Sequence, residues 1–300
     1  MTTLNGLSAF PITPSNADGV VDLPALRQLL SPLMAAQVDS IGLLGSTGTY
    51  MYLSRAERRR VIETAVEAVA ARTPILVGIG ALRTDEAVRL AQDAKAIGAA
   101  AGLLAPVSYT PLNDDEVFEH FETVARDSGL SICIYDNPGT THFRFSPALV
   151  GRLSRIPGIV AIKSPAPDAE SIAAHLAELN STSAEGFSLG YSGDWNSVEG
   201  LLAGASTWYS VLGGIFPEIC VTIVRAVEKG DAAEARRLNV SLEPIWDLFK
   251  TFSSLRVVYA IAEARGICRA HPPRPILPLP TEARQRVVKT LGDLAPEFAR

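Results

Sequence analysis

The 300-residue sequence predicts an α/β protein, a (β/α)8 TIM barrel with a C-terminal helical extension. Eight short apolar runs recur between residues 7 and 212, and a helix-like pattern follows each of them. Only helical patterns remain after residue 229. With 47% hydrophobic and 20% charged residues, the chain has enough apolar surface for a large core. We therefore expect a catalytic barrel at residues 1–229 and a three-helix extension at residues 230–300.

The eight apolar runs lack the alternation of apolar and polar residues that is typical of a half-exposed strand. Parallel strands in a barrel are covered by helices outside and by packed side chains inside, so they are apolar throughout. The strands are expected at residues 7–10, 41–45, 75–80, 100–105, 132–135, 158–163, 187–191 and 207–212.

Helix-period stretches separate these strands, and some carry signals for where a helix begins. Ser54 with Glu57, and Asn113 with Glu116, have the spacing of a capping box, in which each side chain accepts from the other's backbone N–H. The barrel helices are expected at residues 23–37, 55–72, 85–97, 114–128, 147–155, 168–179, 196–203 and 217–228. The extension helices are expected at 232–248, 255–265 and 281–294, with the proline-rich segment 272–280 as an extended connector.

The composition excludes several classes of partner. The formal net charge is −5 and the basic residues are scattered, so the chain lacks the basic patch that nucleic acid requires. No stretch reaches the roughly 18 apolar residues of a membrane span, and residues 1–14 carry no targeting pattern. Cys133, Cys220 and Cys268 show no CxxC spacing and fit buried thiols in a reduced protein. We expect a cytoplasmic protein with a small-molecule partner, no nucleic acid and no membrane.

Nucleotide and metal motifs are also missing. Gly78 and Gly80 follow a predicted strand, as in the alternative doubly wound fold, but the third glycine of GxGxxG is replaced by Arg83. The histidines have no spacing that brings two of them to one ion, and they are His120, His142, His175 and His271. We therefore expect neither a nucleotide cofactor nor a bound metal.

Lys163 is the first candidate catalytic residue, because it alone among five lysines ends a predicted strand. In a barrel, reacting groups lie at the carboxyl ends of the strands. A lysine held there loses water, which favours the neutral amine, and a neutral amine attacks a ketone to form a Schiff base. The alternative is a strand-end lysine that extends to solvent or pairs with a carboxylate.

Two further strand ends offer polar groups. Tyr135 ends the strand before Lys163, so its phenol is expected next to the amine, where it can give and take a proton. The alternative is a half-buried tyrosine without a chemical role. Ser46 and Thr47 lie between two glycines after the second strand, in a loop that is suited to binding a carboxylate or is a simple turn.

The motifs GSTGTYMYLS, IYDNPG and GIVAIK resemble the dihydrodipicolinate synthase and N-acetylneuraminate lyase family of Schiff-base lyases. The resemblance covers most of the chain. It implies a pyruvate-type 2-oxo acid bound as an imine to Lys163, with Tyr135 as proton shuttle and no other cofactor. It also implies that Ser46 and Thr47 bind the substrate carboxylate, that Tyr209 lines the pocket, and that the protein is a homotetramer or dimer.

Four positions depart from the synthases of that family. Their arginine for the second substrate's carboxylate is replaced by Thr140, which argues against the lysine-biosynthesis reaction. Thr49 stands where a glutamate is usual, Ser164 follows the lysine where an acid is frequent, and Ser108 takes the place of a tyrosine. We expect the half that binds pyruvate to be present and the half that binds the second substrate to differ.

The expected function is a class I Schiff-base aldolase, or lyase, acting on a pyruvate-type 2-oxo acid and an aldehyde. Thr140 is expected to favour an aldehyde with hydroxyl or neutral groups, unless Arg144 folds back to supply a charge. Dehydration or aldol cleavage of a 2-keto-3-deoxy sugar acid through the same imine is the alternative. A catalytically silent sensor of 2-oxo acids is the alternative of another class.

Overall fold

The computed structural model describes residues 4–294. Eight parallel strands close into a barrel in the order of the sequence, which confirms the predicted fold class. The two end strands close the barrel, because Gly6 pairs with Thr207 and Ala9 with Ser210. The strands are β1 (Gly6–Ala9), β2 (Ser40–Leu43), β3 (Ile75–Gly78), β4 (Ala101–Leu104), β5 (Ile132–Tyr135), β6 (Ile159–Pro165), β7 (Ser188–Ser192) and β8 (Thr207–Ser210).

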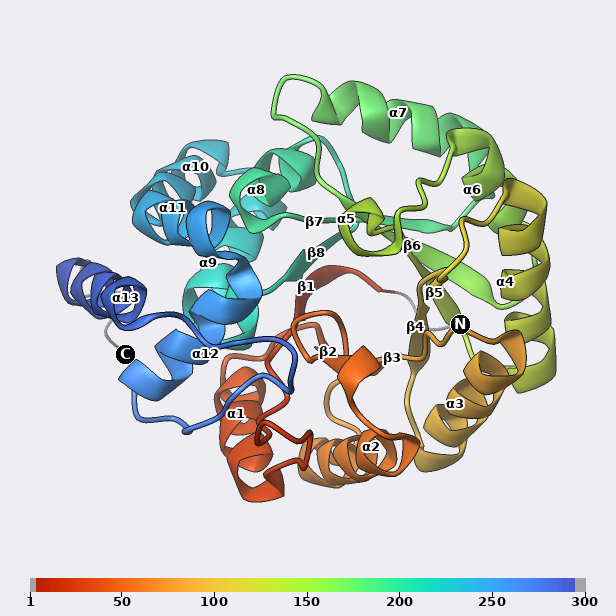
Figure 1. Cartoon of the computed structure of the whole chain (residues 1–300). Coiled ribbons are helices and arrows are strands. Elements are labelled where there is room, and N and C mark those ends of the chain that lie inside the picture. The colour runs from red at the N-terminus through yellow and green to blue at the C-terminus, as the bar shows by residue number, and fades with distance from the viewer. Residues whose placement is uncertain (1–3, 295–300) are drawn as a thin grey trace.

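A ring of helices surrounds the barrel, as Figure 1 shows. Each predicted barrel helix is present, although its ends move by a few residues. An additional short helix, α5, and two 3₁₀ turns follow strands β5, β2 and β8, where loops were expected. The elements are α1 (Leu23–Ala35), η1 (Tyr50–Tyr52), α2 (Arg55–Val69), α3 (Thr84–Ile97), α4 (Asp114–Ser128), α5 (Pro138–Thr141), α6 (Pro147–Leu153), α7 (Ile172–Thr182), α8 (Asp194–Leu202), η2 (Leu212–Gly214) and α9 (Pro217–Glu228).

The capping signals are confirmed at one helix and half confirmed at another. Asn113 and Glu116 form both halves of a capping box at α4. At α2 the Ser54 hydroxyl accepts from the Glu57 amide, but the Glu57 carboxylate accepts instead from the backbone N–H of Val21 at 2.8 Å. The second half is missing because the Glu57 carboxylate binds the loop before α1 to α2 instead.

The extension differs from prediction in one respect. Residues 232–248 form two helices rather than one, because Pro244 has no N–H to continue the first and its ring fits only the opening turn of the second. The extension therefore has four helices among residues 230–294: α10 (Ala232–Ser241), α11 (Glu243–Phe252), α12 (Ser254–Ala264) and α13 (Thr281–Asp293). They lie together on one side of the barrel (Figure 1). Residues 1–3 and 295–300 of the two predicted domains lie outside the described residues.

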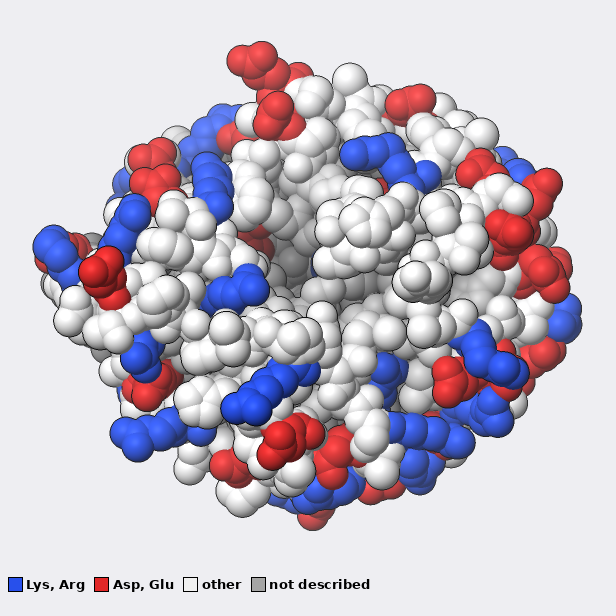
Figure 2. All heavy atoms as spheres, viewed as in Figure 1, with Lys and Arg blue, Asp and Glu red and all other residues white. Residues whose placement is uncertain are grey.

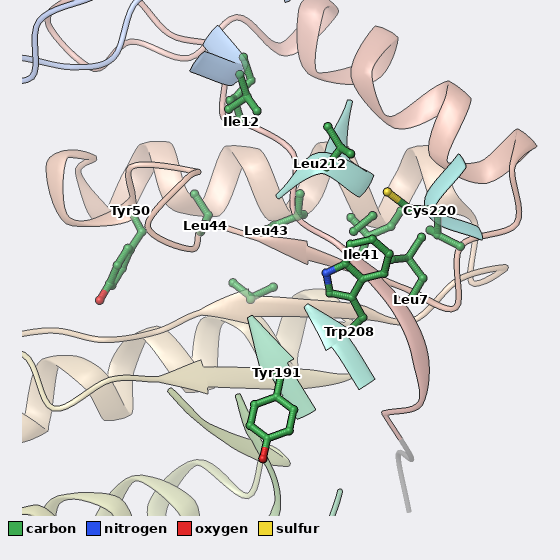
Figure 3. Packing of buried hydrophobic residues seen from close by; sticks show 14 of the residues in the cluster. Leu7, Ile12, Ile41, Leu43, Leu44, Tyr50, Tyr191, Trp208, Leu212 and Cys220 are labelled. Carbon is green, nitrogen blue, oxygen red and sulfur yellow. The ribbon is translucent and has the colours of Figure 1, made fainter. Parts of the chain in front are cut away.

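The core has two parts. The larger packs strand side chains against the helices, and Figure 3 shows Leu7, Ile41 and Trp208 of three neighbouring strands in it. A smaller cluster fills the barrel interior and includes Phe10, Cys133, Tyr135 and Tyr209. Tyr135 is the last residue of β5 and therefore lies at the carboxyl-terminal end of the packed interior, where the strands lead into loops. No helix of residues 4–294 combines the length and apolar character needed to cross a bilayer.

Candidate active site

Lys163 lies inside the mouth of the barrel. Its side chain comes from β6 and only 6% of the residue is exposed. The Nζ atom is 4.1 Å from the centre of the Tyr135 ring and 5.5 Å from that of Phe10. Among residues 4–294 no carboxylate forms an ion pair with this amine, so neither extension to solvent nor pairing with an acid is observed. A buried amine between two aromatic rings is suited to attack on a carbonyl.

Tyr135 is held by two side chains from different loops. Its backbone pairs with that of Lys163 across β5 and β6, which sets the phenol beside the amine. The phenol donates to Ser46 Oγ at 3.1 Å and accepts from Asn137 Nδ2 at 2.9 Å. Asn137 Nδ2 also lies 3.3 Å from Ser46 Oγ, so the three groups form a closed network. A phenol held in this way is poised to transfer a proton at one place.

The loop that carries Ser46 and Thr47 follows β2 and turns sharply. The amide of Thr49 donates to the Ser46 carbonyl at 3.0 Å, and Thr49 has a left-handed backbone with φ of 54°. A Cβ atom at Gly48 would lie 2.9 Å from the Leu44 nitrogen, so only glycine fits there. The tight turn places the Ser46 and Thr47 side chains at the edge of the same cavity as Lys163.

Tyr209 forms the floor of the cavity. It comes from β8, is fully buried, and its hydroxyl contacts Cys133 Sγ at 3.5 Å. Its ring meets that of Phe10 edge to face, with centroids 6.1 Å apart. Burial raises the pKa of this phenol well above its usual value. Tyr209 therefore remains neutral and shapes the floor.

Asp194 fixes the loop beyond the floor. Its carboxylate accepts from the indole N–H of Trp208 at 2.8 Å and from the Leu212 amide at 2.8 Å. Burial raises the pKa of Asp194, and these hydrogen bonds oppose the rise. The acid therefore ties the start of α8 to the end of β8, on the wall of the cavity.

The six predicted residues come together in one cavity of about 370 Å³: Ser46, Thr47, Tyr135, Thr140, Lys163 and Tyr209. Figure 2 shows a hollow at the centre of this face, bordered mainly by uncharged residues. Sequence reasoning missed Phe10, Asn137, Ser253 in the turn between α11 and α12, and Leu255 in the first turn of α12. Asn137 stands in the sequence Asp-Asn-Pro-Gly, a composition typical of turns, so its role has no separate signal.

A second chamber of about 320 Å³ adjoins the first, and we call it the outer chamber. Ser46, Thr140 and Leu255 line both cavities, while Arg256 lines the outer chamber alone. Arg144 lines neither cavity. Its side chain is exposed, so the structure does not show the folding back of this arginine toward Thr140.

The charge of Arg144 instead acts on Asp136, the residue after Tyr135. Asp136 is buried and its Oδ1 has no hydrogen-bond partner among residues 4–294. Burial raises the pKa of Asp136 to about 6, while the charge of Arg144 and hydrogen bonding from the Phe145 amide oppose the rise.

Within residues 4–294 no three His, Cys, Asp or Glu side chains are grouped as a metal site requires.

The barrel and the cavity at its mouth define the class of protein, a lyase that forms a Schiff base. A family model described as the Dihydrodipicolinate synthetase family matches residues 3–294. The chain belongs to this family, as the resemblance of its motifs predicts.

Relatives with this fold come from several bacteria. The 4-hydroxy-tetrahydrodipicolinate synthase of Methylococcus capsulatus is 36% identical over 253 residues, which cover 84% of this chain and 85% of that protein. The enzyme of the same name from Neisseria meningitidis serogroup B is 32% identical over 295 residues, covering 97% and 100%. A crystal structure described as dihydrodipicolinate synthase from Agrobacterium tumefaciens is 51% identical, with a TM-score of 0.95, and the match covers 97% of this chain and 98% of that one.

Proposed function

We propose that the protein is a class I aldolase that binds a pyruvate-type 2-oxo acid as an imine on Lys163. The observation that carries the proposal is the buried amine of Lys163 beside the phenol of Tyr135, with Nζ 4.1 Å from the ring centre and no ion-pair partner among residues 4–294. The amine attacks the ketone carbon, and loss of water gives the imine. Loss of a proton from C3 then gives an enamine, whose C3 forms a bond with the carbonyl carbon of an aldehyde. Water finally releases the product from Lys163, and no metal or nucleotide takes part.

Tyr135 carries the protons in this scheme. The carbinolamine oxygen must gain a proton before it leaves as water, and the aldehyde oxygen must gain one as the carbon–carbon bond forms. The hydrogen bond that the phenol donates to Ser46 at 3.1 Å holds this proton in one direction until a substrate oxygen takes it. Ser46 and Thr47 supply hydroxyls, and their loop supplies backbone N–H groups, for the 2-oxo acid's carboxylate. Tyr209 closes the floor beneath it.

The loop at Thr140 indicates a second substrate with hydroxyl groups. The Thr140 hydroxyl donates to the Asn137 carbonyl at 3.2 Å, and that of Thr141 donates to the same carbonyl at 3.0 Å. The Thr141 oxygen also accepts from the Phe143 amide at 3.4 Å, whereas that of Thr140 is left as an acceptor, which suits a substrate hydroxyl and repels a carboxylate. We propose that condensation with aspartate semialdehyde, the reaction behind the relatives' names, is negligible here.

A 2-keto-3-deoxy sugar acid dehydratase is the second candidate, and the acceptor of Thr140 favours it as well. Such an enzyme forms the same imine and enamine, but the enamine expels a hydroxyl from the neighbouring carbon as water. Product analysis separates the two reactions, since only aldol cleavage releases pyruvate from a sugar acid.

Trapping with borohydride tests the proposal. Pyruvate and borohydride are expected to leave a reduced adduct on Lys163, detected by peptide mass spectrometry. An intact enzyme without an adduct there would overturn the proposal. An adduct with no turnover of any aldehyde or sugar acid would instead favour the silent sensor of 2-oxo acids.

The exclusion of aspartate semialdehyde has its own test, with Thr140→Arg beside Arg144→Ala. We expect negligible wild-type condensation and a gain in Thr140→Arg, because a guanidinium replaces an acceptor where the carboxylate would lie. Efficient wild-type condensation that disappears in Arg144→Ala would show that Arg144 supplies the charge, and the exclusion would be wrong.

The organisation of the chain completes the proposal. We propose that the 1–229 barrel and the 230–300 extension act as one catalytic unit, because the turn between α11 and α12 lines the cavity. We further propose a homotetramer built from dimers, as family membership suggests. Light scattering after size exclusion would settle the oligomeric state, and a monomeric mass would contradict it.

A further inference from the structure

The outer chamber is lined by a positively charged side chain, Arg256, that has no role in the chemistry proposed for Lys163. Arg256 lies in the first turn of α12 and is half buried. Within residues 4–294 it forms no ion pair and no hydrogen bond. Many other arginines of the described chain are paired; Arg55 and Arg59, for example, both contact Asp93. A half-buried guanidinium without a partner has lost part of its hydration and gains strongly from an anion.

The walls around Arg256 limit what that anion can belong to. Met51, Val107 and Ile276 give the chamber apolar sides, and among the residues lining it Arg256 alone is charged. The chamber meets the Lys163 cavity at Ser46, Thr140 and Leu255, which line both. A ligand that joins the imine to Arg256 must therefore pass the Thr140 hydroxyl.

We propose that Arg256 binds an anionic group at the far end of the second substrate. The substrate class is then a hydroxylated aldehyde, or the sugar acid formed from it, that ends in a carboxylate or a phosphate. A hydroxyl next to the reacting carbon meets the acceptor of Thr140, and the terminal anion reaches the guanidinium. The inference rests on the proposed function, because it places the reacting carbonyl at the imine on Lys163.

The two ends of the substrate are thus recognised by different parts of the chain. The loop after β5 accepts hydrogen bonds and disfavours a charge near the reacting carbon. Arg256, from the extension, favours a charge farther away. A guanidinium binds carboxylate and phosphate by the same paired N–H groups, so Arg256 favours a negative terminal group of either kind. The experiment must therefore distinguish a terminal carboxylate from a terminal phosphate.

A matched series of five-carbon aldehydes tests the inference: arabinose, arabinuronate and arabinose 5-phosphate, each with pyruvate. The quantity measured is the ratio of kcat/KM for each anionic aldehyde to that for arabinose. We expect this ratio to exceed about tenfold in the wild type for at least one anion, and to fall about tenfold or more in Arg256→Gln. The anion that shows the larger ratio identifies the terminal group.

Two variants control for charge and for structure. Arg256→Lys is expected to recover part of the ratio, since the charge returns without the paired geometry. Arg269→Gln removes a positive charge from an exposed position of the same extension that lines neither cavity, so the ratio should stay at the wild-type value. A wild-type ratio near one would overturn the inference. So would the absence of turnover for every one of the three aldehydes, or an equal loss of kcat/KM for all three in Arg256→Gln.

Failure of the inference and failure of the proposed function are distinguishable. Borohydride trapping of pyruvate on Lys163 needs no aldehyde. If the adduct forms and the anion preference is absent, only the role of Arg256 is wrong. If no adduct forms, the proposed function fails and the inference fails with it.

Discussion

The Lys163 cavity, which we call the inner cavity, and the outer chamber are built in different ways. In the inner cavity, Lys163 and Tyr135 are each 6% exposed and stand on neighbouring strands of the closed sheet. Around the outer chamber, Thr140 is exposed and Leu255 and Arg256 are half buried, and all three come from segments outside the sheet. Chemistry thus depends on rigid strand ends, and substrate choice on loops and an added helix.

The backbone shows the same contrast. Tyr135 and Lys163 lie in regular paired strands, whereas Ser253, which leads into α12, has φ of 72° and ψ of 128°. A non-glycine residue in such a conformation costs on the order of 1–3 kcal/mol. Surrounding packing must offset that cost. The turn at Ser253 begins the helix at a place where Leu255 lines both cavities and Arg256 lines the outer chamber. A change of substrate therefore requires a change in these segments and leaves the sheet as it is.

The strongest test of the comparison is removal of the amine. Lys163→Ala is expected to abolish borohydride trapping and to lower kcat by about 10⁴-fold or more, because no other group supplies the covalent bond. Lys229→Ala, which changes an exposed lysine that lines neither cavity, is the matched control and should trap normally. An adduct that appears on another lysine in Lys163→Ala would move the chemistry out of the inner cavity.

Removal of the phenol is expected to have the next largest effect. Tyr135→Phe keeps the ring beside Lys163 and loses the proton carrier, so kcat should fall by about 10²- to 10⁴-fold. The Lys163 adduct should still form on long incubation with pyruvate and borohydride. Tyr191→Phe is the matched control, since it removes another buried hydroxyl, which contacts His175 at 2.9 Å outside the cavity. Equal losses in the two variants would show a general effect of buried hydroxyls.

Much of the inner cavity could be predicted from the sequence. Strand runs, barrel geometry and one lysine at a strand end are enough to bring Lys163 and Tyr135 together, because the carboxyl ends of parallel strands meet at one face. Ser46 and Thr47 follow from the two glycines around them. The resemblance to a family added Tyr209, whose position on β8 is not otherwise distinguished from core.

The outer chamber could not be predicted in the same way. Arg256 lies 93 positions beyond Lys163, in a helix whose placement depends on the turn at Ser253. Ser253 has a positive φ, but no glycine in the sequence indicates one there. The interruption at Pro244 was visible in the sequence, but the helical period continues across it and favours one helix. Long-range packing, which no local pattern encodes, decides both positions.

Asp136 offers a test just behind the inner cavity wall in sequence, since it follows Tyr135 and interacts with the charges of Arg144 and Lys163. Its pKa is raised from 3.8 to about 6, so the folded state keeps a proton that the unfolded chain has released between these values. The free energy of unfolding therefore falls as pH rises through this window and is level above it. Asp136→Asn removes the fall, which is worth roughly 2–3 kcal/mol.

Urea unfolding of both proteins at pH 4 and pH 8, at one protein concentration, measures the effect. We expect the variant to gain stability over the wild type by roughly 2–3 kcal/mol more at pH 8 than at pH 4. Asp194 and the other acids titrate in both proteins and cancel. A stability difference between the two proteins that is the same at pH 4 and pH 8 would show that Arg144 stabilises the charged carboxylate as much as burial opposes it.

The smallest expected effect concerns Asn137, which belongs to the inner cavity although it follows the strand. Its amide donates to Tyr135 Oη at 2.9 Å, and since an amide NH₂ only donates, the phenol must direct its own proton to Ser46. Asn137→Leu keeps the shape and frees the phenol, so kcat should fall about three- to tenfold, the worth of one hydrogen bond. In a Tyr135→Phe background the same substitution should cost nothing further, because its partner is already gone. An equal loss in both backgrounds would show that Asn137 does not act through Tyr135 but through Ser46, which lies 3.3 Å from its amide, or on the substrate itself.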